Sequence, residues 1–239
     1  MNLSAENTGY QALNASIRAH NGDVFIDHCL GQRYIGAGQS KKTIIIDGTP
    51  GNALGAYLNG ARIVVHGNAQ DATGDTMNDG EIVIHGSTGD AAGYAMRGGA
   101  IYVRNDAGYR AGVHMKAYAE KSPVIVIGGK CGSFLGEYQA GGTILVLGID
   151  VPDKEVIGYF CGTGMHGGKI FLRARQLYRP LPEQVHMERA SKADLEMIQP
   201  YLKKFVALFN RPVPDDDGKD FFVLTPNSNN PYRQLYVQN

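Results

Sequence analysis

A repeat of 19 residues constrains the fold of this chain more than any other feature of its sequence. Five glycines stand 19 positions apart, and an apolar triplet begins eight residues after each of the first four. The repeated glycines are Gly36, Gly55, Gly74, Gly93 and Gly112. The triplets occupy residues 44–46, 63–65, 82–84 and 101–103. A sustained period of this length is typical of solenoids, whose stacked repeats bury one continuous core.

The length and the residue types of the repeat favour strands over helices. Nineteen residues are too few for a helical hairpin, and the triplets are rich in isoleucine and valine, which prefer strands. Glycine at each corner allows the positive φ that closes a coil. Further units with insertions follow at 144–146 and 170–172, and a degenerate unit precedes at 24–27. We therefore predict an all-β chain, a single-stranded right-handed parallel β-helix of about seven 19-residue coils.

Alternation along each strand predicts which side chains face the core. Ile63 and Val65 must point inward, because their neighbours Arg62 and His66 cannot lie in a dry interior. The middle residue of each triplet then points outward and is nevertheless apolar. These outward residues are Ile45, Val64, Val83, Tyr102, Leu145 and Phe171. A continuous apolar stripe on the outside of a solenoid needs a cover.

A helix near the C-terminus is the candidate cover for this stripe. Ser191 is suited to cap its start, and Pro200 predicts a kink or a split. The apolar residues at helical spacing are Leu195, Ile198, Leu202, Phe205 and Phe209. We expect the helix to cover part of the stripe and a partner protein the rest.

The chain accordingly divides into three segments. Residues 1–21 form an N-terminal segment, 22–178 the β-helix, and 179–239 a C-terminal helix and docking tail with an aromatic end at Tyr232 and Tyr236. The open sheet edges of the end coils must be capped or paired, so a homo-oligomer is one of the alternatives.

The charge balance narrows the class of partner. Lysine plus arginine and aspartate plus glutamate each number 23, so the formal net charge is zero, which argues against nucleic acid. No stretch approaches the length of a membrane span, and the N-terminus has no signal-like apolar run. We expect a cytoplasmic protein that binds neither nucleic acid nor membrane.

One candidate metal site arises from the stacking of the coils. Asp47, His66, His85 and Arg104 occupy equivalent positions in successive units, and two histidines beside a carboxylate are possible ligands for a divalent metal. Arg104 would repel a cation, and a spacing of about 4.8 Å spreads the ligands along a line. A solvated ladder is the favoured interpretation.

Other possible sites are weaker still. The stretch 162–168 is glycine-rich and includes His166, but a strand rather than a helix follows it, so it is interpreted as a coil corner. Cys29, Cys131 and Cys161 are too scattered for a metal cluster, and Ser133 lies in no nucleophile elbow. No catalytic, cofactor-binding or metal-binding residue is assigned. A carbohydrate-active β-helix enzyme remains an alternative, although the insertions are short for building a cleft.

The glycine-rich corners resemble those of a known family. The stretches 51–58, 67–71, 136–142 and 162–168 look like the C-terminal glycine-repeat (GXGXG) domain of the glutamate synthase large subunit, and the resemblance covers roughly residues 22–173. The glycine-repeat subunit of formylmethanofuran dehydrogenase, which has the same repeat, is the nearest rival.

This resemblance implies a function through other chains. The domain packs against the flavin-containing synthase domain and the glutaminase domain without supplying catalytic groups. Here it would be a free-standing structural subunit of a multi-chain glutamate synthase, with no cofactor of its own and with FMN and iron–sulfur on the partner chains. Whether any activity resides on this chain is left open.

Overall fold

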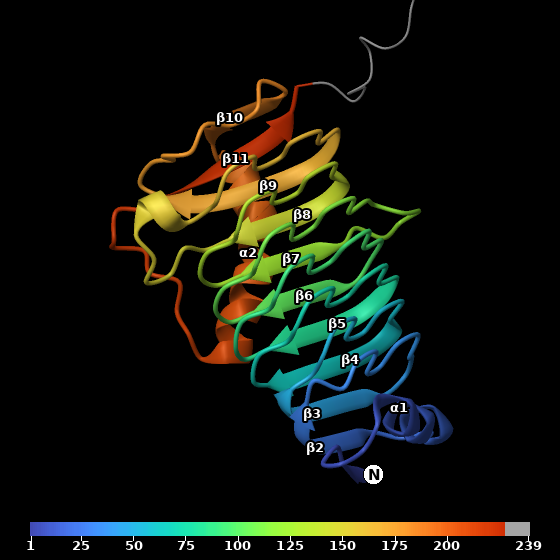
Figure 1. Ribbon diagram of the computed structural model, residues 1–239. Coiled ribbons are helices and arrows are strands. Elements are labelled where there is room, and N and C mark those ends of the chain that lie inside the picture. The colour runs from blue at the N-terminus through green and yellow to red at the C-terminus, as the bar shows by residue number, and fades with distance from the viewer. Residues whose placement is uncertain (228–239) are drawn as a thin grey trace, which may run out of the picture.

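The computed structural model describes residues 1–227, which form a tall parallel β-solenoid with one long strand per coil (Figure 1). The strands are β1 (Asn2–Ser4), β2 (Val24–Leu30), β3 (Thr43–Thr49), β4 (Asn59–His66), β5 (Asp79–Ile84), β6 (Ala100–Val103), β7 (Val124–Ile127), β8 (Ala140–Val146), β9 (Gly167–Ala174), β10 (Val185–Arg189) and β11 (Asp220–Pro226). The helices are α1 (Tyr10–Ala19), α2 (Lys192–Phe209) and the 3-10 helix η1 (Asp153–Glu155).

One 11-stranded sheet runs the whole height of the molecule. Strands β1 to β9 follow in sequence order and pair in parallel, and β11 and β10 then continue the sheet antiparallel. Ile44 pairs with Ile63, and Ile63 pairs with Ile82, so the register advances by the 19-residue repeat. The predicted right-handed parallel β-helix is confirmed.

The solenoid has eight coils, strands β2 to β9, where the sequence predicted about seven. The missed strand is β7, whose Ile125 pairs with Ile101 of β6. An insertion around residues 116–122 places Ile125 thirteen residues after Gly112, whereas the other triplets begin at eight. Because five extra residues are accommodated in a loop outside the coil, the strand register is preserved although the sequence period is lost.

The segments before and after the coils share the sheet and the core. β1 pairs with β2, and Leu13 and Ile17 of α1 are buried against the first coil. At the other end Leu224 of β11 joins the same interior cluster. The docking role predicted for the tail falls partly on 228–239, which lie outside the described residues.

The interior contains the aliphatic residues that alternation predicted. Ile63, Val65, Ile82 and Ile84 are completely buried in one cluster that extends from β1 to β11. Burial of each such side chain contributes about 1.5–3 kcal/mol, so this stack stabilises the solenoid along its whole length.

Each coil turns at a corner where left-handed residues alternate with ordinary ones. In the coil of β5, Ala72, Gly74 and Thr76 all have φ between +51° and +70°. The Gly74 N–H donates to Leu54 O of the preceding coil, and the Thr76 N–H donates to Tyr94 O of the following coil. The corner backbone thus bonds the coils on both sides. A Cβ on Gly74 would lie 2.5 Å from Ile101 Cδ1, which explains why glycine recurs there.

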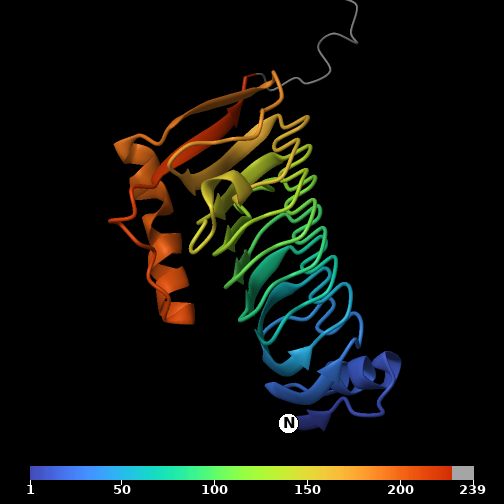
Figure 2. The ribbon, with the colours of Figure 1, turned by 60° about the vertical axis from the view of Figure 1, so that its left-hand side comes forward.

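Helix α2 lies along the outer face of the sheet and covers the apolar stripe (Figure 2). Ser191 caps it through a capping box with Asp194. Ile198, Phe205 and Phe209 are buried against the stripe, which includes Val83, Val126, Leu145 and Phe171. The predicted cover is confirmed for this part of the stripe.

Of the two outcomes predicted at Pro200, a kink or a split, the split does not occur, because α2 continues through Pro200 as one element. One expectation about α2 needs correction. Leu195 is 42% exposed and does not face the stripe, because the buried face follows Asp194, Ile198 and Phe205 rather than the neighbouring row.

Two ion pairs fasten α2 to the solenoid at different heights. Asp194 accepts from Lys169 Nζ of β9 at 2.6 Å, and Lys204 Nζ lies 2.7 Å from Glu81 of β5. The bond from Lys169, supported by Ser191, lowers the pKa of Asp194 to about 2. Burial opposes ionisation of Glu81, but Arg62 and Lys204 outweigh it and lower its pKa.

We expect Asp194→Asn to lower stability at neutral pH by about 2 kcal/mol, because a charge-assisted bond is lost. The folded pKa of Asp194 lies below its ordinary 3.8, so its stabilisation is present above 3.8 and is lost as pH falls toward about 2. Denaturant unfolding of both proteins from pH 7 to pH 2 should therefore show the difference shrinking below pH 4. A difference that stays constant with pH would contradict this role.

Candidate protein-docking surface

Aromatic and arginine side chains gather along the corners of the last four coils, and most of them are exposed. We call this surface the aromatic ridge. Its members are Tyr94, Tyr109, Arg110, His114, Phe134, Tyr138, Tyr159, Phe160 and Arg179. Tyr109 and Phe160 are 57% and 55% exposed.

The corner geometry explains why these side chains point outward. The residues two before and two after each repeated glycine have positive φ and flank the inward-facing glycine. The position two before carries alanine at Ala72 and Ala91, and then becomes Arg110, Phe134 and Phe160. Stacking of the coils converts this change in sequence into a continuous row of large side chains.

The rings of the aromatic ridge stack on one another. The Phe134 and Phe160 rings have centroids 5.0 Å apart, and the His114 and Tyr138 rings stack nearly parallel with centroids 5.1 Å apart. The Arg110 guanidinium lies 4.9 Å from the Phe134 centroid and its Nε is 3.2 Å from Glu137. Such stacks and cation–π contacts hold the side chains in place before any partner binds.

Further polar contacts shape the ends of the ridge. Arg179 lies 4.3 Å over the Tyr159 ring and also donates to its hydroxyl at 2.8 Å. Tyr109, Arg110, Ser133 and Phe134 line a recess of about 420 Å³. Tyrosine, phenylalanine and arginine are the residues enriched where proteins bind other proteins. The ridge therefore has the residue composition and the surface shape of a protein-docking surface.

The aromatic ridge was not predicted from the sequence, although a signal was present. The strand triplets identify the stripe beneath α2 but say nothing of the corner residues. Comparing the positions two residues before each repeated glycine would have shown the change from alanine to arginine and phenylalanine.

The Asp47–His66–His85–Arg104 ladder forms as the repeat predicted, without converging. His66 Nδ1 lies 2.7 Å from Asp47 Oδ1, and the His66 and His85 rings meet edge to face at 5.3 Å. Phe209 of α2 lies against His85 on its other side, so this rung is not fully solvated. Burial lowers the pKa of His85, assisted by His66 and Arg104. Within residues 1–227, no three His, Cys, Asp or Glu side chains come together as a metal site.

The remaining candidates are occupied by structural roles. Gly162 and Gly164 form the corner of the last coil, where a Cβ on Gly164 would meet the Tyr138 ring at 2.4 Å. His166 Nδ1 contacts Gly164 O nearby. All three cysteines are buried, and burial raises the pKa of Cys131 to about 12. The thiolate required of a nucleophile is thus disfavoured.

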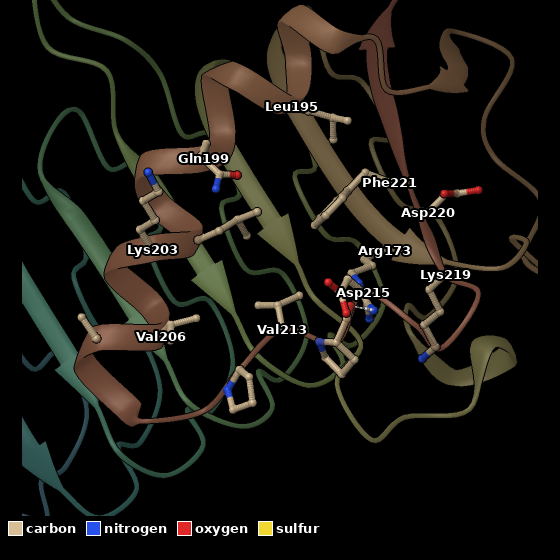
Figure 3. A pocket seen from close by; sticks show the side chains of 14 residues that line it. Arg173, Leu195, Gln199, Lys203, Val206, Val213, Asp215, Lys219, Asp220 and Phe221 are labelled. Carbon is tan, nitrogen blue, oxygen red and sulfur yellow. Dashed lines mark hydrogen bonds between the residues drawn. The ribbon is translucent and has the colours of Figure 1, made fainter.

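A larger pocket of about 700 Å³ lies between α2 and the segment before β11 (Figure 3). Leu195, Val206 and Phe221 give it apolar walls. The cations at its edge are engaged by the chain itself. Arg173 is 2% exposed and bonds Asp217 at 2.6 Å, and Lys219 Nζ donates to Gly148 O and Val151 O. This pocket is apolar, and these two cations are not free to bind a ligand.

Comparison with known proteins assigns the family. The model of the GXGXG motif family matches residues 8–218. The chain belongs to the GXGXG motif family. The uncharacterized protein MJ1350 of Methanocaldococcus jannaschii is 43% identical over 98% of this chain and 95% of its own length. The family match extends over the coils and α2 and ends just before β11.

A solved structure shares the fold of this GXGXG protein. It is the formyltransferase/hydrolase complex FhcABCD of Methylorubrum extorquens in complex with methylofuran, one chain of which matches with a TM-score of 0.60. The match is 21% identical and covers 79% of this chain and 69% of that one. In the GXGXG chain itself, no helix among residues 1–227 is long and apolar enough to cross a membrane.

Proposed function

We propose that this chain is a non-catalytic structural subunit of a multi-chain glutamate synthase. It docks through the aromatic ridge onto the flavin-containing synthase chain and holds the glutaminase chain at a fixed distance. FMN and iron–sulfur reside on the partner chains, and the assembly is cytoplasmic.

The observation that carries this proposal is the aromatic ridge. Tyr109 and Phe160 are exposed, and the half-buried Phe134 ring stacks on Phe160. Truncation of such residues at interfaces commonly costs about 2 kcal/mol or more. The candidate reactive groups are elsewhere and engaged: the Cys131 thiol is buried and His66 is bonded to Asp47. A rigid solenoid with an ordered outer ridge is suited to positioning other chains.

A second candidate function follows from the fold shared with the FhcABCD complex. The chain would then be a structural subunit of a formyltransferase/hydrolase or formylmethanofuran dehydrogenase-type assembly. Both candidates use the solenoid as a structural subunit, and they differ in the chemistry of the partner.

Affinity capture with the full chain tests the proposal. Tagged chain should recover from native extract a partner that carries FMN and iron–sulfur, detected by its absorption spectrum, together with glutamine-dependent glutamate formation. Phe160→Asp combined with Phe134→Ala should reduce this capture at least about tenfold, because buried aromatic contacts are lost and a charge enters the interface.

Tyr57→Ala is the matched control. Tyr57 is 59% exposed at a corner of an early coil, outside the aromatic ridge, and its loss should leave capture unchanged. Formyl-transferring activity in the captured material would support the second candidate instead. Equal capture by the ridge variant and the wild type would refute docking through the ridge.

A further inference from the structure

We propose that the exposed edge of β10 pairs with the β10 edge of a second copy of this chain, joining the two 11-stranded sheets end to end in a twofold dimer. This inference concerns the C-terminal end of the solenoid and is independent of the aromatic ridge. Among the described strands β10 pairs with β11 alone, so its other edge faces outward. His186, Met187, Glu188 and Arg189 are all exposed on it.

The hydrogen bonds between β10 and β11 determine which backbone N–H and C=O groups of β10 remain available to another strand. The bonds Asn227 N–H to Gln184 O and Ala190 N–H to Phe221 O show that even-numbered residues bond β11. Bonding direction alternates along an antiparallel strand. Met187 and Arg189 therefore direct their N–H and C=O groups away from β11, where a further strand would receive them.

The side chains of the edge are complementary to their own reverse copy. An antiparallel partner centred on Met187 places each His186 opposite a Glu188 of the other copy. Within one chain His186 Nε2 and Glu188 Oε2 already lie 3.7 Å apart, which shows that both side chains share a face. A ring nitrogen of His186 can bond the Glu188 carboxylate on the facing strand, whereas a parallel copy would place like residues together.

The hydrogen-bonding pattern of the backbone and the facing side chains favour the same arrangement. With a twofold axis at Met187, the two Met187 residues face each other and exchange backbone hydrogen bonds. His186 of each copy then faces Glu188 of the other in a non-hydrogen-bonded pair, where facing side chains lie closer together. Such a contact uses the same patch on both copies and closes as a dimer, not as a fibre. The occupant that fits this edge is therefore a second copy of the chain.

Sedimentation equilibrium of the full chain across a wide concentration range tests the dimer. The wild type should dimerise, and Met187→Pro should weaken dimerisation about 100-fold, because proline removes an outward N–H and obstructs the pair. Met187→Ala keeps the N–H and should dimerise within a few-fold of the wild type. Unchanged thermal unfolding of the Met187→Pro monomer would show that the β10–β11 pair is intact.

Charge variants test the register independently. His186→Glu should weaken the dimer by placing carboxylates opposite each other, and His186→Glu combined with Glu188→His should restore it. A wild type that is monomeric at every concentration would overturn the proposal. So would a dimer that survives Met187→Pro, since another surface would then hold the copies together.

Discussion

Gly93→Ala should destabilise the chain by about 2–5 kcal/mol. Gly93 has φ +69°, and a left-handed backbone costs a residue with a Cβ about 1–2 kcal/mol. The new methyl group would also lie 2.4 Å from Ile125 Cδ1 in the packed interior. Overpacking of this kind costs about 1–3 kcal/mol more. Equilibrium unfolding in denaturant measures the sum.

Gly38→Ala separates the two costs. Gly38 has the same φ of +69°, but a Cβ there would meet nothing within 4 Å. We expect it to lose only the backbone contribution of about 1–2 kcal/mol. Equal losses in the two variants would mean that the corner glycine is required for its backbone conformation alone and not for the close approach of the isoleucine ladder.

Phe205→Ala should cost about 3–5 kcal/mol and loosen α2 from the sheet. Phe205 is completely buried, and its ring lies over Gly128, where an added Cβ would meet Phe205 Cζ at 2.7 Å. Calorimetric or denaturant unfolding measures the loss. NMR titration of His85 reports the position of the helix, because Phe209 lies against that ring and burial lowers its pKa. Loosening of α2 should raise the pKa of His85.

Val206→Ala is the control on the same helix. Val206 is 37% exposed and lines the open pocket beside the buried face of α2, so its truncation should change stability by less than about 0.5 kcal/mol. A stability loss in Phe205→Ala with no change in the His85 pKa would contradict the expected movement of the helix end.

The sequence predicted the parts of the fold that repeat. The corner glycine, the inward isoleucines and the outward stripe each recur every 19 residues. Each structural requirement of a coil is therefore visible at several equivalent positions of the sequence. β7 was missed because its insertion breaks the period without breaking the register. β10 and β11 were missed because their pairing depends on the open edge of β9, which exists only once the coils have formed.

The candidate site was predicted less well than the fold. The apolar stripe and its covering helix followed from periodicity, and the His66–His85 ladder formed where the repeat placed it. The aromatic ridge depends on which corner residues point outward, and this follows from three alternating left-handed residues such as Phe134, Gly136 and Tyr138. Sequence propensities do not predict positive φ at phenylalanine or tyrosine, so the direction of these side chains required the structure.

Helix α2 crosses several coils, and this has a consequence for how the molecule comes apart. In a simple stacked array each unit contacts only its neighbours, so unravelling proceeds one rung at a time from either end. The C-terminal part of α2 contacts Glu81 of β5, and its N-terminal part contacts Lys169 of β9. These contacts join β5 to β9 into one block. Local unfolding within that block requires α2 to detach first, whereas β2 and β3 can unfold locally without this step. Backbone amide hydrogens should accordingly exchange faster in β2 and β3 than in β5 to β9.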